Sequence, residues 1–260
     1  MANPTFSRNP AFNGRGGAPT QEVTPESLQA MYNAPSATAV DTGRMTYEDT
    51  ITKTAGLFAV LLVGAAVGWL FPALAIVGAI VGLVLGLVNS FKREPSVPLI
   101  VAYAAFEGLF VGGISAIFEA QPGMAGIAVQ AVLATLVVVG VVLALFRSGK
   151  IRASAKATKI FMIAMVSYLA FSLVNFGLVI FGVLDSPFGL RSGVLGLVIG
   201  ALAVLMASYS LVLDFDFVQR AVRTGQPRKL GWQAAFGLMV TVVWLYVEFL
   251  RIFAILRGSD

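Results

Sequence analysis

The stretch Ser208–Arg220, SYSLVLDFDFVQR, places two carboxylates, Asp214 and Asp216, at the end of a long apolar run. The part of that run before them, residues 190–213, holds a single charged residue, Arg191. A charged side chain near the centre of a lipid bilayer costs at least ~2.5–3.5 kcal/mol. What the two acids do therefore depends on whether this run crosses a membrane.

The composition is that of a membrane protein. The chain has 260 residues, of which 58% are hydrophobic and 12% charged, and its mean hydropathy is +0.86. Soluble domains carry about 25% charged residues. Seven apolar runs lie at residues 52–71, 73–91, 98–118, 124–146, 159–183, 190–222 and 231–256. Each is near the length of about 20 residues that crosses a bilayer as a helix. The sequence therefore predicts an all-α polytopic membrane domain of seven transmembrane helices over residues 47–260.

The residue types that are absent exclude several kinds of chemistry. The chain contains neither Cys nor His. This excludes thiolate nucleophiles, Ser–His or Cys–His catalysis, haem ligation and zinc sites built from those ligands. The net charge of +5 comes from basic residues in short loops beside apolar runs, which indicates membrane topology rather than nucleic-acid binding. We expect no enzymatic activity, no cofactor and no nucleic-acid partner.

The basic residues also predict the orientation of the chain. Fifteen of the 18 Lys and Arg lie in the amino-terminal segment or in the loops after the second, fourth and sixth runs. Loops on the cytoplasmic side carry such an excess, so the N-terminus is expected in the cytoplasm and the C-terminus outside it. Residues 1–46 are rich in Asn, Pro, Gly and Ala and lack a long apolar run, which predicts a disordered cytoplasmic tail.

Glycine spacing indicates how one of the spans packs. Gly78, Gly82 and Gly86 recur at four-residue intervals in the second run. Small residues four apart lie on one side of a helix and let a neighbouring backbone come close. We interpret this row as a packing face within the chain.

Four acids, Glu107, Asp214, Asp216 and Glu248, lie in the spans or at their edges. Carboxylates in such places face the interior of a bundle, find partners or take up a proton. Asp214 and Asp216 are about 200° apart on a helix, so they point to different faces. Glu248 and Arg251 are three residues apart and can pair on one face. These acids are the candidates for ion or proton chemistry.

Four stretches carry a resemblance to a known family. They are MTYEDTITKT (45–54), AYAAFEGLFVGGIS (102–115), LVLDFDFVQRAV (211–222) and WQAAFGLMVTVVWLYVEFLRIF (232–253). In this order on seven spans they resemble the Bax inhibitor-1-like family, also called the transmembrane Bax inhibitor motif family, and most of all its bacterial branch with a long polar N-terminal tail. The resemblance implies a seven-helix bundle in a bacterial plasma membrane, with the last helix central and wrapped by the other six.

The resemblance also implies a function, that of a pH-sensitive calcium leak channel. Matched by motif, Asp214 of the sixth span and Glu248 of the seventh would share a proton, gate the pore and offer oxygen ligands to Ca²⁺. Glu107 would lie on the ion path, with Asp216 and Arg251 as accessory residues. The expected partners are the lipid bilayer, calcium ions and protons, and the expected state is a monomer.

Helix geometry sets a condition on this carboxylate pair. If the sixth span ends near Arg223 and the seventh begins near Gly231, Asp214 lies ~14 Å from the turn and Glu248 ~26 Å from it. The two acids would then differ in depth by about 12 Å. They meet only if the sixth helix continues past Arg223, or if the seventh begins late or tilts.

Other functions fit the same residues. A proton-coupled transporter would use Glu107 and Glu248 equally well. A non-conducting regulator that binds another membrane protein needs no ion path at all. An intramembrane aspartyl protease also needs two acids on neighbouring spans, but neither Asp214 nor Asp216 follows the Gly-x-Gly motif typical of those enzymes.

Overall fold

The computed structural model describes residues 24–26, 29, 43–184, 186 and 188–258. The chain divides into two units, residues 1–42 and 43–260. The tail predicted over residues 1–46 lies mostly outside the described residues. Its last four residues, 43–46, belong to the second unit, and Met45 is buried there.

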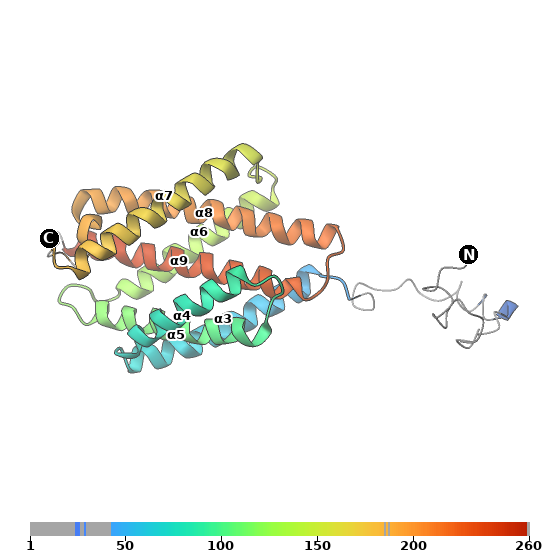
Figure 1. The fold of residues 1–260 in the computed structure, drawn as a ribbon, viewed down its shortest axis with the longest axis horizontal. Coiled ribbons are helices and arrows are strands. Elements are labelled where there is room, and N and C mark those ends of the chain that lie inside the picture. The colour runs from blue at the N-terminus through green and yellow to red at the C-terminus, as the bar shows by residue number, and fades with distance from the viewer. Residues whose placement is uncertain (1–23, 27–28, 30–42, 185, 187, 259–260) are drawn as a thin grey trace, which may run out of the picture. The chain divides into compact units, whose positions relative to one another are not determined.

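Seven long helices form the described part of the second unit. They are α3 (Tyr47–Leu70), α4 (Leu74–Phe91), α5 (Val97–Glu119), α6 (Ile127–Arg147), α7 (Ala155–Ile180), α8 (Gly193–Arg223) and α9 (Leu230–Gly258), with a short 3-10 helix, η1 (Gly189–Arg191), before α8 (Figure 1). Each long helix overlaps one of the seven predicted runs. The first begins earlier than its apolar run because Thr46 caps it, accepting a hydrogen bond from the amide of Asp49.

All seven helices are long and apolar enough to cross a membrane. Their outer faces carry large apolar side chains such as Leu62, Leu83 and Val166, which are 64%, 65% and 64% exposed. Soluble proteins rarely expose apolar surface on this scale, whereas lipid tails cover it in a bilayer. The predicted all-α polytopic membrane fold is confirmed.

Close contacts at glycine hold the first three helices together. A Cβ atom added at Gly78 would lie 2.5 Å from the backbone nitrogen of Phe110, and one at Gly86 would lie 3.2 Å from the ring of Tyr103. The glycine row of α4 therefore packs on α5, as the spacing predicts. Gly64 of α3 approaches α5 in the same way, since a Cβ atom added there would lie 3.2 Å from the Cα of Gly108. Side chains at these positions would force the helices apart.

Helix α9 is the most buried of the seven, with 56% of its apolar stretch inside the bundle. It packs against α3, α5, α6 and α8. Figure 1 shows it running between the α7–α8 pair and the group formed by α3, α4 and α5. The implied central place of the last helix is therefore observed. The wrapping is looser than the resemblance implies, because α4 packs mainly on α5 and α7 reaches α9 through the side chain of Tyr168.

One end of the bundle, here called the basic end, carries the connections 92–96, 148–154 and 224–229 together with the start of α3. The amide of Met45 donates to the carbonyl of Gln226 at 2.8 Å. Asp49 pairs with Lys53 at 2.5 Å and with Arg228 at 2.7 Å. The hydrogen bond to Asp49 raises the pKa of Arg228, so the pair stays charged. These bonds tie the start of α3 to the α8–α9 connection.

Candidate functional site

The two helices that carry the predicted gating acids, α8 and α9, lie very close together. Gly196, Gly200, Ala203 and Ala207 of α8 are all buried and recur every three or four residues. Such a row of small side chains lets the backbone of a neighbouring helix approach. A Cβ atom added at Gly200 would lie 2.7 Å from Cγ1 of Ile252 on α9. We call the contact between these helices the α8–α9 seam.

Asp214 faces the seam toward the basic end. Its Oδ2 accepts a hydrogen bond of 2.8 Å from the hydroxyl of Thr241, which is itself 3.2 Å from the hydroxyl of Ser210. Gly237 leaves room for the carboxyl, since a Cβ atom there would lie 3.1 Å from Oδ1 of Asp214. Asp214, Ser210 and Thr241 form the Asp214 site. Within the described part of the chain, no ion pair includes Asp214.

Glu248 is surrounded by donors. It is only 3% exposed, and it forms ion pairs with Arg251 and, at 2.8 Å, with Arg191. Its Oε1 also accepts hydrogen bonds from the hydroxyl of Tyr168 and, at 3.4 Å, from Nε1 of Trp244. These five residues form the Glu248 cluster, in which two cations face one anion. The predicted pairing of Glu248 with Arg251 is confirmed.

The structure does not bring Asp214 and Glu248 together. Asp214 meets α9 at Thr241, and Glu248 lies seven residues further along that helix, a distance of about 10.5 Å. Because α8 ends at Arg223 and α9 begins at Leu230, the sixth helix is not extended and the seventh does not begin late. The shared-proton pair implied by the resemblance is therefore not formed in this conformation. The reason is that seven residues of α-helix separate Thr241, which Asp214 contacts, from Glu248.

An apolar layer separates the two sites. Ala207 and Leu211 of α8 and Leu245 of α9 are each 0% exposed and pack in one cluster. Val142 and Phe146 of α6 cover the same cluster. Buried apolar side chains thus fill the seam between the Asp214 site and the Glu248 cluster.

The remaining sequence candidates lie apart from both sites. Asp216 pairs with Arg220 at 2.7 Å, and the Arg220 side chain is 69% exposed, so the two aspartates of α8 do face different ways. Glu107 is half-buried between α5 and α4, beside Tyr103, and its Oε2 lies 2.8 Å from a Cβ atom added at Gly82. Among the described residues, no group of three or more acids could hold a metal ion. The suggested calcium ligands Asp214 and Glu248 do not converge.

Five residues of these sites were not predicted from the sequence: Arg191, Tyr168, Trp244, Ser210 and Thr241. Arg191 is the only basic residue of the loops on the opposite side from the basic end, next to an apolar run, which marks it as unusual. Thr241 is seven residues from Glu248 and so lies on the same face of α9. Tyr168 offered no signal, because an aromatic residue inside a span is common.

The geometry defines a class of protein: a polytopic helical membrane protein with one carboxyl site on each of its last two helices. Its family follows from comparison with known proteins. The family model described as Bax inhibitor 1 like matches residues 3–258, so the chain belongs to the Bax inhibitor 1-like family. A comparison with curated proteins finds no match.

Proposed function

We propose that this protein is a pH-sensitive, calcium-permeable leak channel, and that the seam between α8 and α9 is its gate in the closed state. The observation that carries the proposal is the Asp214 site. There a carboxyl group inside the bundle has hydroxyl partners and no cation among the described ion pairs. We place the protein in a bacterial plasma membrane with its N-terminus in the cytoplasm.

Proton exchange at Asp214 is the proposed sensor. Burial disfavours the charged form of a carboxyl group that has no cation beside it. With a proton bound, Asp214 stays hydrogen-bonded to Thr241 and holds α8 against α9. Loss of the proton leaves a carboxylate that attracts water and cations into the seam. Carboxylate and hydroxyl oxygens are hard ligands of the kind that Ca²⁺ prefers.

The apolar layer of Leu211 and Leu245 is the proposed barrier. Hydrophobic constrictions close ion paths by excluding water. A path along the seam from the Asp214 site to the other end of the bundle has to cross this layer, where both leucines are 0% exposed. Hydration of Asp214, about one turn from Leu211, would loosen the packing of that layer and admit ions.

Glu248 and Glu107 take different parts in this proposal. Glu248 already has two cationic partners, so we assign it to holding α7 and the segment at η1 against α9 in the closed state. Glu107 lies between α4 and α5, apart from the seam, and we assign it as a cation ligand to a part of the ion path that lies outside the seam. Replacement of Glu107 by Gln should then lower calcium flux without changing its pH profile.

Reconstitution into liposomes that contain a calcium-sensitive dye tests the function. The wild-type protein should release calcium faster as the pH rises from about 6 to about 8, because deprotonation of Asp214 opens the proposed gate. Asp214→Asn should flatten this profile. Asp216→Asn is the matched control, since it removes an acid two residues away on the other face of α8, and its profile should stay like that of the wild type.

Other outcomes identify the alternatives. Proton movement that depends on a transported solute, without calcium flux, would indicate a proton-coupled transporter. Absence of any flux in well-folded protein at every pH would favour the non-conducting regulator. An unchanged pH profile in Asp214→Asn would contradict the sensor assignment even if calcium passes.

A further inference from the structure

Helix α7 is joined to the bundle at two places along its length. Toward the basic end, the hydroxyls of Thr158 and Tyr209 are 3.0 Å apart. Toward the opposite end, Asn175 accepts a hydrogen bond of 2.7 Å from the amide of Leu190, and Tyr168 joins the Glu248 cluster. Asn175 is the one buried residue in α7, whose residues 155–180 are all described. The stretch between the two attachments is therefore poorly packed.

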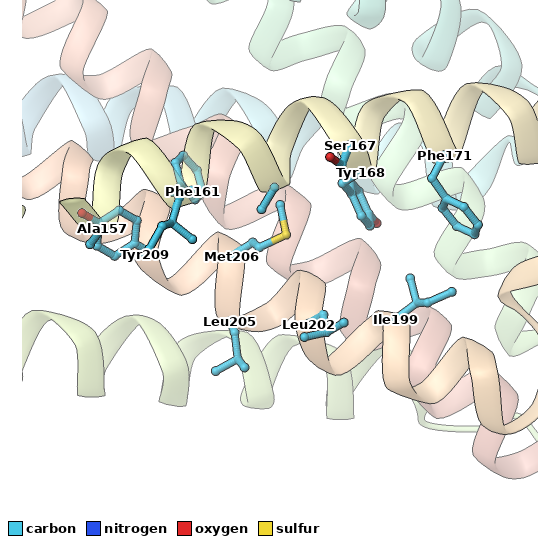
Figure 2. A pocket seen from close by; sticks show the side chains of 12 residues that line it. Ala157, Phe161, Ser167, Tyr168, Phe171, Ile199, Leu202, Leu205, Met206 and Tyr209 are labelled. Atoms are coloured by element: carbon cyan, nitrogen blue, oxygen red, sulfur yellow. The ribbon is translucent and has the colours of Figure 1, made fainter. Parts of the chain in front are cut away.

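A groove of about 600 Å³ lies between α7 and α8. Figure 2 shows Phe161, Tyr168 and Phe171 on α7 facing Leu202 and Met206 on α8. The residues of α7 that line the groove run from position 157 to position 171, a length of about 21 Å. One leaflet of a bilayer is about 15 Å of hydrocarbon. An apolar groove of this length, open to the membrane, has the dimensions of an extended acyl chain.

The groove begins beside an uncompensated cluster of positive charge. Arg147, Lys150, Arg152, Lys156 and Lys159 are all exposed, in the α6–α7 connection or at its borders. The sequence has no Asp or Glu between Glu119 and Asp185. No ion pair of the described residues includes any of the five.

Lys156 is the cation placed best for a ligand of the groove. It directly precedes Ala157 and lies one turn before Ile160, both of which line the groove. It also lies in the first turn of α7, where the helix dipole attracts anions. Long basic side chains at the end of a span extend toward the lipid headgroups.

We propose that this groove is a binding site for an anionic phospholipid, with one acyl chain between α7 and α8 and the phosphate beside Lys156. Basic pockets between transmembrane helices are known to bind such headgroups. The apolar lining suits the chain, and the charge of the rim selects the headgroup. Because Tyr168 lines the groove and also bonds to Glu248, the bound chain would contact the Glu248 cluster. The proposal does not depend on channel activity.

Native mass spectrometry of the purified full chain in detergent tests the site. We expect dioleoyl phosphatidylglycerol to be retained at least about tenfold more tightly than dioleoyl phosphatidylcholine, as two basic side chains near the headgroup allow. Millimolar inorganic phosphate should not displace the lipid, because the acyl chain contributes to binding. Equal retention of the two lipids, or displacement by phosphate alone, would overturn the proposal.

Two variants locate the site. Lys156→Gln combined with Lys159→Gln should weaken phosphatidylglycerol binding roughly fivefold for each lysine and leave phosphatidylcholine unchanged. Ala164→Phe should fill the groove and reduce binding of both lipids. Val166→Phe adds a ring on the opposite face of α7, where the side chain is 64% exposed, and should change neither.

The lysine variant keeps the proposal testable if Ala164→Phe does not fold, because both lysines are exposed. Circular dichroism and size-exclusion chromatography check folding in each case. Full phosphatidylglycerol affinity in the folded lysine variant would contradict the site.

Discussion

The Glu248 cluster and the Asp214 site lie about two turns apart along one face of α9, yet their carboxyl groups are held in opposite ways. Glu248 has two arginines, a tyrosine and a tryptophan around it. Asp214 has a threonine hydroxyl, with a serine beyond it. Cations beside a buried acid favour its charged form, whereas hydroxyl partners leave the acid without a neutralising charge. We therefore call the Glu248 cluster the anchor and the Asp214 site the sensor.

The largest expected effect is at the anchor. Arg251→Met removes a cation from a carboxylate that is 3% exposed, so we expect a loss of about 3–5 kcal/mol in the free energy of unfolding. Denaturant titration in mixed micelles, followed by circular dichroism, measures this loss. A loss below about 1 kcal/mol, typical of exposed ion pairs, would mean that the Glu248 cluster is not an anchor.

A smaller effect is expected at the sensor. Thr241→Val keeps the shape of the side chain but removes the donor to Asp214, which should destabilise the protein by about 1–3 kcal/mol. It should also shift the pH at which calcium flux rises toward lower values, because the closed state loses a bond. The same liposome assay measures the shift, and Thr241→Ser, which keeps the hydroxyl, should behave like the wild type. A shift in the opposite direction would contradict the proposed latch.

The smallest effect is expected at the exposed ion pair of α8. Arg220→Met removes the partner of Asp216, and because the Arg220 side chain is 69% exposed, the loss should be about 0–1 kcal/mol. It also serves as the matched control for Arg251→Met, since each replaces an arginine paired to a carboxylate three or four residues away. Equal losses of unfolding free energy in the two variants would contradict the expected difference between the buried and the exposed ion pair.

The sequence correctly predicted those features of the structure that depend on a single helix. Each of the seven apolar runs overlaps a helix, because insertion depends on the length and composition of a single segment. The packing face of α4 followed from its four-residue glycine spacing. The pairing of Glu248 with Arg251 and the divergence of Asp214 from Asp216 followed from the angle between positions on one helix. Family membership followed from motifs that are continuous in the chain.

Only the tertiary structure decided what the acids touch. Arg191 and Glu248 are 57 residues apart, and no local pattern brings a loop residue onto the middle of α9. Asp214 meets Thr241 rather than Glu248 because the lengths of α8, its connection and α9 set the register of the seam. The groove beside α7 likewise arises from where that helix is attached. Periodicity within a helix assigns each side chain to a face, but which faces meet, and at what depth, depends on how separate helices pack.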